Sequence, residues 1–258
     1  MKHVVSYSGG ICSALAAVRV KEGMRTGDEI VLLFADTLIE DEDLYRFNKE
    51  FSAWLGLPLT VVCDGRTPWQ VFSDVRMLGN SRIDPCSRIL KRELLWHWTV
   101  ENCDPDATTV YLGTDWTEDH RLKRVRAARP GWRIEAPMAD PPLFDKSQMS
   151  AYMRDTIGIE PPRLYGMGFA HNNCGGFCIK SGQAQFELLL RQFPQRYHEH
   201  EKNEQKIREQ LDKNVSVLRD RRGGETTPLT LREFRERLER QPDLFDSYDW
   251  GGCGCAID

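Results

Sequence analysis

Short apolar runs alternate with longer amphipathic segments over the first half of the chain. Aliphatic and β-branched residues around Val4 and Val5 and at 29–34, 59–63 and 108–112 predict buried strands, and residues 132–138 predict a last short one. The alanine-rich segment after residue 13 has helical spacing, and so does the segment from residue 44 to 55, which follows an acidic N-terminus. Strands that alternate with helices of this length predict a parallel sheet with right-handed crossovers.

Beyond the paired prolines at 141 and 142 the pattern changes. Helices are predicted at 146–157, 183–193 and 194–213, followed by a basic turn at 219–222. Thr230 and Glu233 form a capping box that opens a last helix. We therefore predict an α/β fold: a parallel twisted sheet with helices on both faces, Rossmann-like, in residues 1–140. A mainly helical, cysteine-rich region is expected in residues 141–258.

Length and composition limit the classes to which this protein can belong. A chain of 258 residues buries one substantial core, or one core with an appendage. No apolar run approaches the roughly 20 residues of a membrane span, and the N-terminus has no signal-peptide core. We expect a cytoplasmic protein with no membrane partner. A formal charge of -4 argues against general coating of nucleic acid but allows local basic patches.

A glycine pair lies between the first predicted strand and the first predicted helix, in the sequence SYSGGICS at 6–13. Backbone N–H groups and the positive end of a helix dipole converge in such a turn, which suits phosphate. The Gly-Lys-Ser/Thr ending of the Walker loop is absent. We expect the phosphates of a nucleotide to be held by Ser6, Ser8, Gly9, Gly10 and Ser13. The alternative is an ordinary strand-to-helix turn.

Polar residues also follow the second and fourth strands. Asp36 and Thr37 end one of them, and Gly113 ends the other. Ligands bind beyond the carboxyl ends of strands in such sheets, so these residues are candidates for the nucleotide site, although a helix cap is the alternative for the first two. Five cations then crowd residues 121–129, of which Arg121 and Arg124 are nearest the strand end. They contact phosphate or nucleic acid, or they belong to a solvated helix face.

A second basic segment, DPCSRILKRELL, occupies residues 84–95. Arg88 and Lys91 lie one helical turn apart there, which would let both cations grip phosphate or sulfate oxygens. The alternative is a solvated basic face.

The eight cysteines are unevenly placed, and five of them lie among glycines and polar residues. In a chain without a secretion signal, such clusters indicate metal or redox chemistry. Glycines in the loop at 171–178 and in the tail let both pairs of cysteines fold back toward one point. We predict a shared zinc ion or iron–sulfur cluster, with His171 in reserve, held by Cys174, Cys178, Cys253 and Cys255.

Taken together, these motifs resemble those of the PAPS reductase family within the PP-loop ATP pyrophosphatase superfamily (adenine nucleotide alpha hydrolase-like). The matching segments are SGGxxS at 8–13, FADT at 34–37 and CSRILKRE at 86–93. Cys12 stands where many members have Asp, and Ser87 replaces the second cysteine of the reductases' tandem pair. The resemblance implies ATP with Mg²⁺, catalytic roles for Cys86, Arg88 and Lys91, and a 4Fe–4S cluster in preference to zinc.

The intact loop implies an enzyme that cleaves ATP to AMP and pyrophosphate. We therefore expect an ATP pyrophosphatase that adenylates an acceptor for sulfur transfer, with nucleic acid as one acceptor class and a sulfur-donor protein as partner. Two alternatives stay open. The first is a thiol-dependent sulfonucleotide reductase that uses a tail cysteine and a thiol reductant protein. The second is a non-catalytic nucleotide- or nucleic-acid-binding module with structural zinc.

Overall fold

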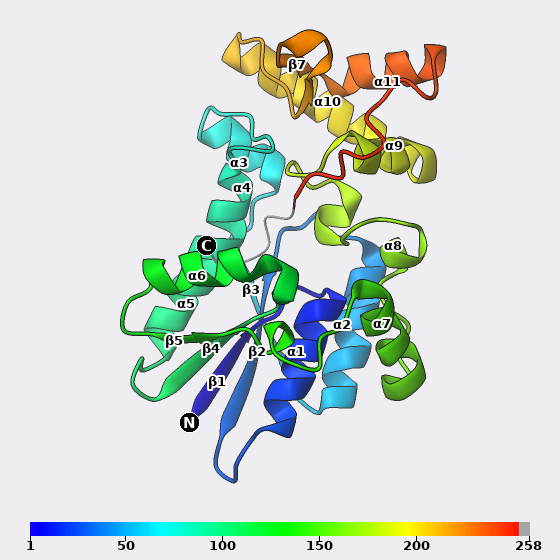
Figure 1. Ribbon diagram of the computed structural model, residues 1–258. Helices are drawn as coiled ribbons and strands as arrows, with labels where there is room; N and C mark the ends of the chain where they lie inside the picture. Colours follow the sequence, from blue (N-terminus) through cyan, green and yellow to red (C-terminus); the bar gives the residue numbers. More distant parts are fainter. Residues whose placement is uncertain (253–258) are drawn as a thin grey trace.

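A five-stranded parallel sheet forms the centre of the lower half of the molecule in the computed structural model, which describes residues 1–252 (Figure 1). The strands are β1 (Lys2–Ser6), β2 (Glu29–Asp36), β3 (Leu59–Cys63), β4 (Thr108–Leu112) and β5 (Arg133–Glu135), in the order β3-β2-β1-β4-β5. Ser6 is in register with Leu33 on one side and Leu112 on the other. The carboxyl ends of three central strands therefore meet at one edge, and the predicted fold class is confirmed.

Helices cover both faces of the sheet. One face packs against α1 (Ile11–Glu22), α2 (Glu42–Leu55) and α7 (Lys146–Ala151), which continues as a π-helical turn (Tyr152–Ile157). The other face packs against α5 (Leu94–Asn102) and α6 (Asp119–Ala128). Because side chains alternate along a strand, Val4 enters one of these cores and Val5 the other.

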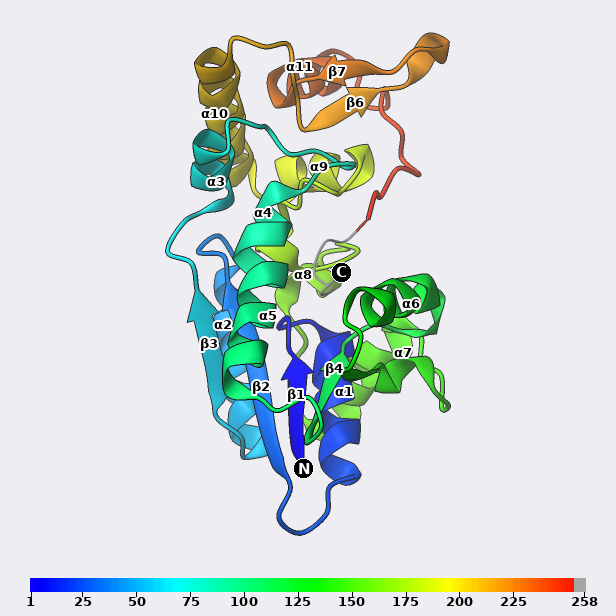
Figure 2. The ribbon, with the colours of Figure 1, turned by 90° about the vertical axis from the view of Figure 1, so that its left-hand side faces the viewer.

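A third hydrophobic core lies above the sheet in the view of Figure 1. It joins α9 (Gln183–Gln192), α10 (Pro194–Leu211), α11 (Leu231–Arg240) and a two-stranded hairpin of β6 (Leu218–Asp220) and β7 (Thr227–Leu229). The short helix α3 (Pro68–Asp74) from the first half of the chain packs into the same core. A continuous helix formed by α4 (Pro85–Ser87), a π-helical turn (Arg88–Glu93) and α5 connects the two levels (Figure 2). The hydrophobic cores thus cross residue 140, where the sequence suggested a domain boundary.

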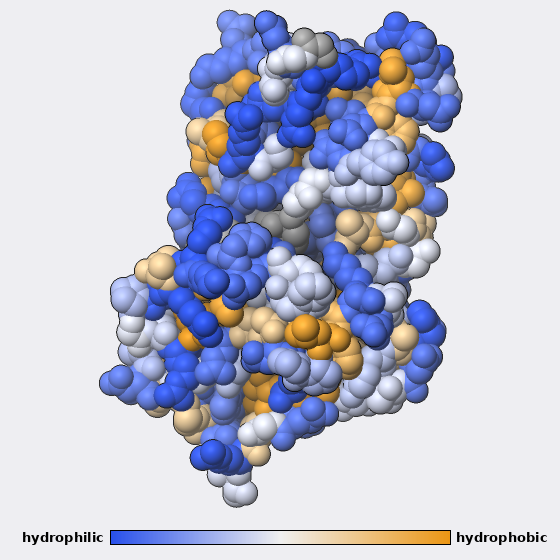
Figure 3. Space-filling view, in the orientation of Figure 1, coloured by the Kyte–Doolittle hydropathy of each residue, from blue (hydrophilic) through white to orange (hydrophobic). Residues whose placement is uncertain are grey.

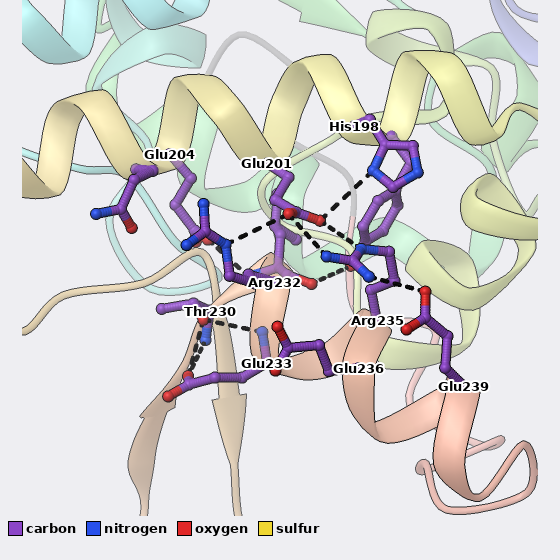
Figure 4. A network of polar contacts seen from close by, with 12 residues as sticks. His198, Glu201, Glu204, Thr230, Arg232, Glu233, Arg235, Glu236 and Glu239 are labelled. Atoms are coloured by element: carbon purple, nitrogen blue, oxygen red, sulfur yellow. Dashed lines mark hydrogen bonds and ion pairs between the residues drawn. The ribbon is translucent and has the colours of Figure 1, made fainter.

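Buried carboxylates join α10 to the hairpin and to α11 (Figure 4). Glu201 accepts two hydrogen bonds from Arg235, at 2.8 and 3.1 Å. Glu204 accepts from the backbone N–H groups of Val217 and Leu231, at 2.8 and 2.6 Å. Burial raises the pKa of Glu204 to about 7.

Differences from the sequence prediction are confined to short elements. The helices predicted at 146–157, 183–193 and 194–213 are confirmed to within two residues, and the capping box of Thr230 and Glu233 is present. The strand predicted at 132–138 stops at Glu135, because Pro137 opens a 3₁₀ turn. The basic turn expected at 219–222 includes part of strand β6, and α3 and α8 (Arg163–Gly166) were not predicted. Elements this short have too few residues to show a periodicity.

No helix within residues 1–252 is long and apolar enough to cross a membrane. The face shown in Figure 3 is largely hydrophilic, with its hydrophobic residues in scattered groups.

Acid should destabilise the protein through a buried neutral histidine. His200 stacks on Phe177 with ring centroids 3.7 Å apart, and its Nδ1 accepts a hydrogen bond from Trp69 Nε1 at 3.0 Å. Burial lowers the pKa of His200 to about 3. Below the unfolded pKa of about 6.5 the unfolded chain binds a proton that the folded state excludes, so stability falls by up to about 1.4 kcal/mol per pH unit.

The His200→Phe variant should therefore lose less unfolding free energy than the native protein when urea unfolding is repeated at about pH 7 and about pH 5. His97, whose side chain is 71% exposed, provides the matched control His97→Phe. Equal pH dependence in the two variants would contradict this role of His200.

Candidate nucleotide cleft and cysteine cavity

The loop between β1 and α1 is organised by its own hydroxyls. Ser13 Oγ accepts from the backbone N–H of Ser8 at 3.1 Å and donates to the carbonyl of Gly10 at 2.9 Å. Gly10 is the N-cap of α1, so the capping residue has no side chain to accept from the N–H groups of the first turn. This open helix N-terminus is a favourable place for an anion.

At three glycines of this edge, an added Cβ would meet different neighbours. Gly9 has φ +73°, and a Cβ there would lie 2.9 Å from Asn48 Oδ1. A Cβ on Gly113 would lie 2.6 Å from Ser13 Cα, so this glycine lets the end of β4 approach the start of α1. Gly10 has an ordinary φ of -92°, and its Cβ would approach the Tyr165 hydroxyl at 3.0 Å. A methyl group added at Gly10 would therefore lie among the polar atoms of Ser8, Tyr165 and Asn172.

A cleft of about 180 Å³, named here the α1 cleft, opens over this helix N-terminus. Its near wall is the loop with Ser6, Ser8, Gly10 and Ser13, and Gly113 lies at its edge. Its far wall comes from the segment at 165–173. Asn172 Nδ2 donates to the carbonyl of Gly9 at 3.1 Å, and Asn172 Oδ1 accepts from the Tyr165 hydroxyl at 3.3 Å. Four of the five predicted loop residues therefore line one cavity, and Gly9 does not line it.

Three residues that line the α1 cleft each have a buried polar atom without a hydrogen-bond partner among the described residues. The atoms are Thr114 Oγ1, Arg121 Nη2 and His171 Nδ1. A buried polar atom without a partner costs about 1–3 kcal/mol, so such atoms usually have one. Arg121 is 8% exposed, which makes its free N–H group the strongest indication of an anionic ligand.

Charges of both signs surround the α1 cleft. Arg121 pairs with Glu118, the residue immediately before α6, and Lys146 Nζ donates to the carbonyl of Ala170 at 2.7 Å. Asp115 also lines the cleft and supplies a carboxylate of the kind that Mg²⁺ prefers. Arg124 is exposed and does not line the cleft.

Two further groups in the cleft are uncharged near neutral pH. Burial lowers the pKa of His171 to about 4, so its imidazole is neutral. Burial, helped by the carboxylates of Asp115 and Glu118, raises the pKa of Cys12 to about 12. Cys12 is therefore a protonated thiol, and it does not substitute for the Asp that many proteins of the resembled superfamily have at this place.

The two residues predicted at the end of β2 point to different places. Asp36 accepts from the Tyr45 hydroxyl and from the backbone N–H of Leu38, at 2.8 and 2.9 Å, and does not line the α1 cleft. Thr37 is buried and donates to Glu40 Oε1 at 2.9 Å. Thr37 lines a neighbouring cavity instead.

Glu40 joins three segments in that neighbourhood. Its Oε1 accepts from Lys91 Nζ at 3.0 Å, and its Oε2 accepts from the backbone N–H of Cys174 at 2.6 Å. Both side chains of the ion pair are buried, with 2% of Glu40 and 10% of Lys91 exposed. Burial alone would lower the pKa of Lys91, but the acidic groups around it, with Glu40 paired to its Nζ, outweigh burial and the net pKa is raised. Lys91 is therefore a charged residue inside the protein.

Arg88 and Lys91 are not brought together. Arg88 is exposed and pairs with Glu93 at 2.8 Å, whereas Lys91 is buried against Glu40. The cause is the π-helical turn at Arg88–Glu93. A π-helix has more residues per turn than an α-helix, so residues three apart no longer lie on one face.

Lys91 and three cysteines line a small cavity of about 20 Å³, named here the cysteine cavity. Cys174, Gly175 and Gly176 have positive φ angles of 52°, 61° and 89°, which fold the loop back so that Cys174 and Cys178 share this cavity with Cys86. Burial raises the pKa of Cys86 to about 12 and that of Cys174 well above its usual value. Without a metal ion these two thiols are therefore protonated.

Within residues 1–252, no three His, Cys, Asp or Glu side chains are arranged to hold a metal ion. Cys253 and Cys255, the other half of the predicted four-cysteine site, lie outside the described residues. The shared metal site stays a prediction, and Cys86 joins the candidates for its ligands.

Sequence reasoning missed Glu40, Thr114, Lys146, Tyr165 and Asn172. Glu40, Lys146 and Asn172 contact distant segments, and the contact of Asn172 with Gly9 spans 163 positions. No local pattern distinguishes such residues from ordinary polar ones.

Comparisons with known proteins give weak matches. No protein-family model matches the chain. An uncharacterized nin region protein, ORF290 of Escherichia phage lambda, is 26% identical over 217 residues, which cover 74% of this chain and 70% of that protein. Among solved structures, the phosphoadenylyl-sulfate (PAPS) reductase of Candida auris, in a phosphate complex, is similar with a TM-score of 0.44 and 15% identity. That match covers 65% of this chain and 77% of the reductase.

Proposed function

We propose that this protein is a PP-loop enzyme that binds ATP in the α1 cleft and transfers its adenylyl group to an acceptor. The observation that carries the proposal is the set of buried polar atoms without partners, above all Arg121 Nη2, around the open N-terminus of α1. An uncharged ligand would not explain why a guanidinium with an unused N–H donor is buried beside the cleft. The oxygens of a polyphosphate would accept hydrogen bonds from these donors.

In the proposed reaction, an acceptor oxygen attacks the α-phosphorus of ATP. The bond between the α-phosphorus and the bridging oxygen breaks, and pyrophosphate leaves with the bond electrons. The loop N–H groups and Arg121 hold phosphate oxygens and stabilise the charge that develops on the leaving group. Asp115, a carboxylate that lines the cleft, would hold a Mg²⁺ ion, which would neutralise phosphate charge. The adenylated acceptor then has AMP as a leaving group for a sulfur nucleophile.

Gly10→Ala should impair ATP binding without unfolding the protein. The added methyl group would lie 3.0 Å from the Tyr165 hydroxyl and 3.4 Å from Ser8 Oγ, inside the α1 cleft, while the φ angle at residue 10 suits alanine. We expect ATP affinity to fall about tenfold or more, the cost of losing one good charge-assisted contact. Titration calorimetry with ATP and a pyrophosphate-release assay measure the two consequences.

Gly23→Ala is the matched control. This glycine is the C-cap of the same helix with a φ of -86°, and its nearest contact would be 3.6 Å away. If Gly10→Ala binds ATP as tightly as Gly23→Ala does, ATP does not lie against the N-terminus of α1. Gly9→Val would be a poorer test, because its positive φ and its contact with Asn48 would disturb folding as well.

The second candidate function is thiol-dependent reduction of a sulfonucleotide. It is favoured by the three cysteines that line the cysteine cavity, which adjoins the α1 cleft at Asn173. The raised pKa values of Cys86 and Cys174 make neither of them a thiolate near neutral pH, so the attacking thiolate of such a reductase would come from a tail cysteine. Sulfite release without pyrophosphate release would favour the reductase, and nucleotide binding without either product would favour a non-catalytic module. Metal analysis of protein purified without oxygen would identify zinc or iron at the cysteines.

A further inference from the structure

A second charged cavity adjoins both the cysteine cavity and the α1 cleft. Its volume is about 400 Å³, and it is lined by four segments, at 81–82, 180–182, 217–221 and 249–252. Lys180 lines both this cavity and the cysteine cavity. The three cavities therefore adjoin one another: the α1 cleft and the cysteine cavity share Asn173, and the cysteine cavity and this one share Lys180. The α1 cleft also borders this cavity directly, because His171 Nε2 lies 3.2 Å from Ser181 Oγ.

The lining of this third cavity is strongly basic, and we name it the cationic cavity. Its four cations, Arg82, Lys180, Arg219 and Arg221, face one carboxylate, that of Asp249, so the lining has a charge of 4 - 1 = +3 in a chain of formal charge -4. These cations are weakly compensated. Arg221 is 3.9 Å from Asp249, Lys180 is 3.6 Å from Asp84, and Arg219 Nε is buried without a hydrogen-bond partner in the described part of the chain.

Two aromatic side chains flank Asp249 and are exposed to solvent. Tyr248 is 92% exposed and Trp250 is 40% exposed. Their backbone is nevertheless held in place, because the carbonyl of Asp249 accepts from Ala184 N at 3.0 Å and Gly252 N donates to the carbonyl of Lys180 at 2.8 Å. In Figure 1 this segment, in red, runs from α11 down past α9 toward the sheet domain. The backbone that carries the two rings is thus fixed beside the lining of this cavity, to which Asp249, Gly251 and Gly252 belong.

We propose that the cationic cavity binds single-stranded nucleic acid, and that this strand is the acceptor of the adenylyl group. The proposal rests on the proposed function, whose acceptor it names. Cations bind the phosphates of a strand, and exposed aromatic rings stack on its bases. A free phosphate compound would use the cations alone, and an acidic peptide would have no bases to stack on Tyr248 and Trp250. The contact between His171 of the α1 cleft and Ser181 of the cationic cavity places a bound strand beside the nucleotide whose adenylyl group it accepts.

The first test measures the anisotropy of fluorescently labelled single-stranded RNA and DNA oligonucleotides on the full-length protein. Arg82→Ala combined with Arg221→Ala should weaken binding and reduce the slope of log affinity against log salt concentration by about 2, one unit per lost phosphate contact. The matched control is Arg25→Ala combined with Lys49→Ala, which removes the same charge from exposed positions elsewhere. Equal loss in both double variants would overturn the proposal, because it would show only a general effect of net charge.

The second test concerns the bases. Tyr248→Ala and Trp250→Ala should each weaken single-strand binding by roughly fivefold to a hundredfold, the range of one lost stacking contact. Trp54→Ala, which removes a ring that is 46% exposed on α2, should have no effect. Native affinity in both tail variants, or equally tight binding of duplexes, would overturn the proposal in favour of a site for phosphate alone.

ATP binding to the same variants separates this inference from the proposed function. The expected result is unchanged ATP affinity by calorimetry together with weakened oligonucleotide binding. Native protein that binds oligonucleotides through this cavity but does not bind ATP would contradict the proposed function and leave the strand-binding site standing. Native protein that binds ATP but no oligonucleotide would overturn the strand-binding site alone.

Discussion

Replacing Arg121 with alanine should weaken ATP binding by about tenfold to a hundredfold, the value of a hydrogen bond between charged groups in a buried place. Arg121 is 8% exposed, lines the α1 cleft and has an unpartnered Nη2. The variant should fold, because its present partner Glu118 has a side chain that is 31% exposed and is readily hydrated. Calorimetric titration with ATP, together with a thermal unfolding curve without nucleotide, separates lost binding from lost structure.

Arg124→Ala is the matched control for this prediction. Arg124 lies three positions further along α6, is exposed and does not line the cleft. Its replacement should change ATP affinity by less than about twofold, since an exposed surface substitution usually has an effect within about 0.5 kcal/mol. Equal losses of ATP affinity in the two variants would mean that α6 attracts ATP by its overall charge. A loss confined to Arg124→Ala would mean that Arg124, as the sequence predicted, is the phosphate contact.

The largest effect on stability is expected at Lys91. Lys91→Met keeps the side-chain stem but leaves the carboxylate of Glu40, which is 2% exposed, without its cation. Breaking a buried ion pair by removing one partner costs about 3–5 kcal/mol. Urea unfolding should show this loss, and Lys91→Met combined with Glu40→Gln should recover part of it because no uncompensated charge then remains buried.

The same double variant distinguishes a structural from a catalytic lysine. If Lys91 only neutralises Glu40, the double variant should recover turnover together with stability, whereas a lysine that acts on the substrate would leave turnover low in a stable protein. Arg88→Met is the control on the same helix, because its pair with Glu93 is more than half exposed on both sides and should contribute at most about 1 kcal/mol. A Lys91→Met protein of native stability would contradict the buried-pair interpretation.

Local sequence patterns determined most of the framework. The alternation of apolar strands with amphipathic helices predicted the parallel sheet, and the sheet brings Ser6, Gly113 and the loop glycines to one edge. These predictions succeeded because hydrophobic periodicity and turn chemistry depend on neighbouring residues. The loop at 8–13 was found for the same reason, since a strand, two glycines and a helix start are consecutive in the chain.

Only the tertiary structure decided which of the charged and thiol side chains act together. The sequence predicts Arg121 and Arg124 equally as phosphate contacts, yet packing buries the side chain of Arg121 beside the cleft and leaves that of Arg124 in solvent. Cys86 lies beside Cys174 and Cys178 because Glu40 and Lys91 hold the loop and the helix together. Whether a side chain is buried, and which residues it contacts, depends on which distant surfaces meet when the sheet, the connecting helix and the upper core pack. The residues that decide this packing are spread over the whole chain.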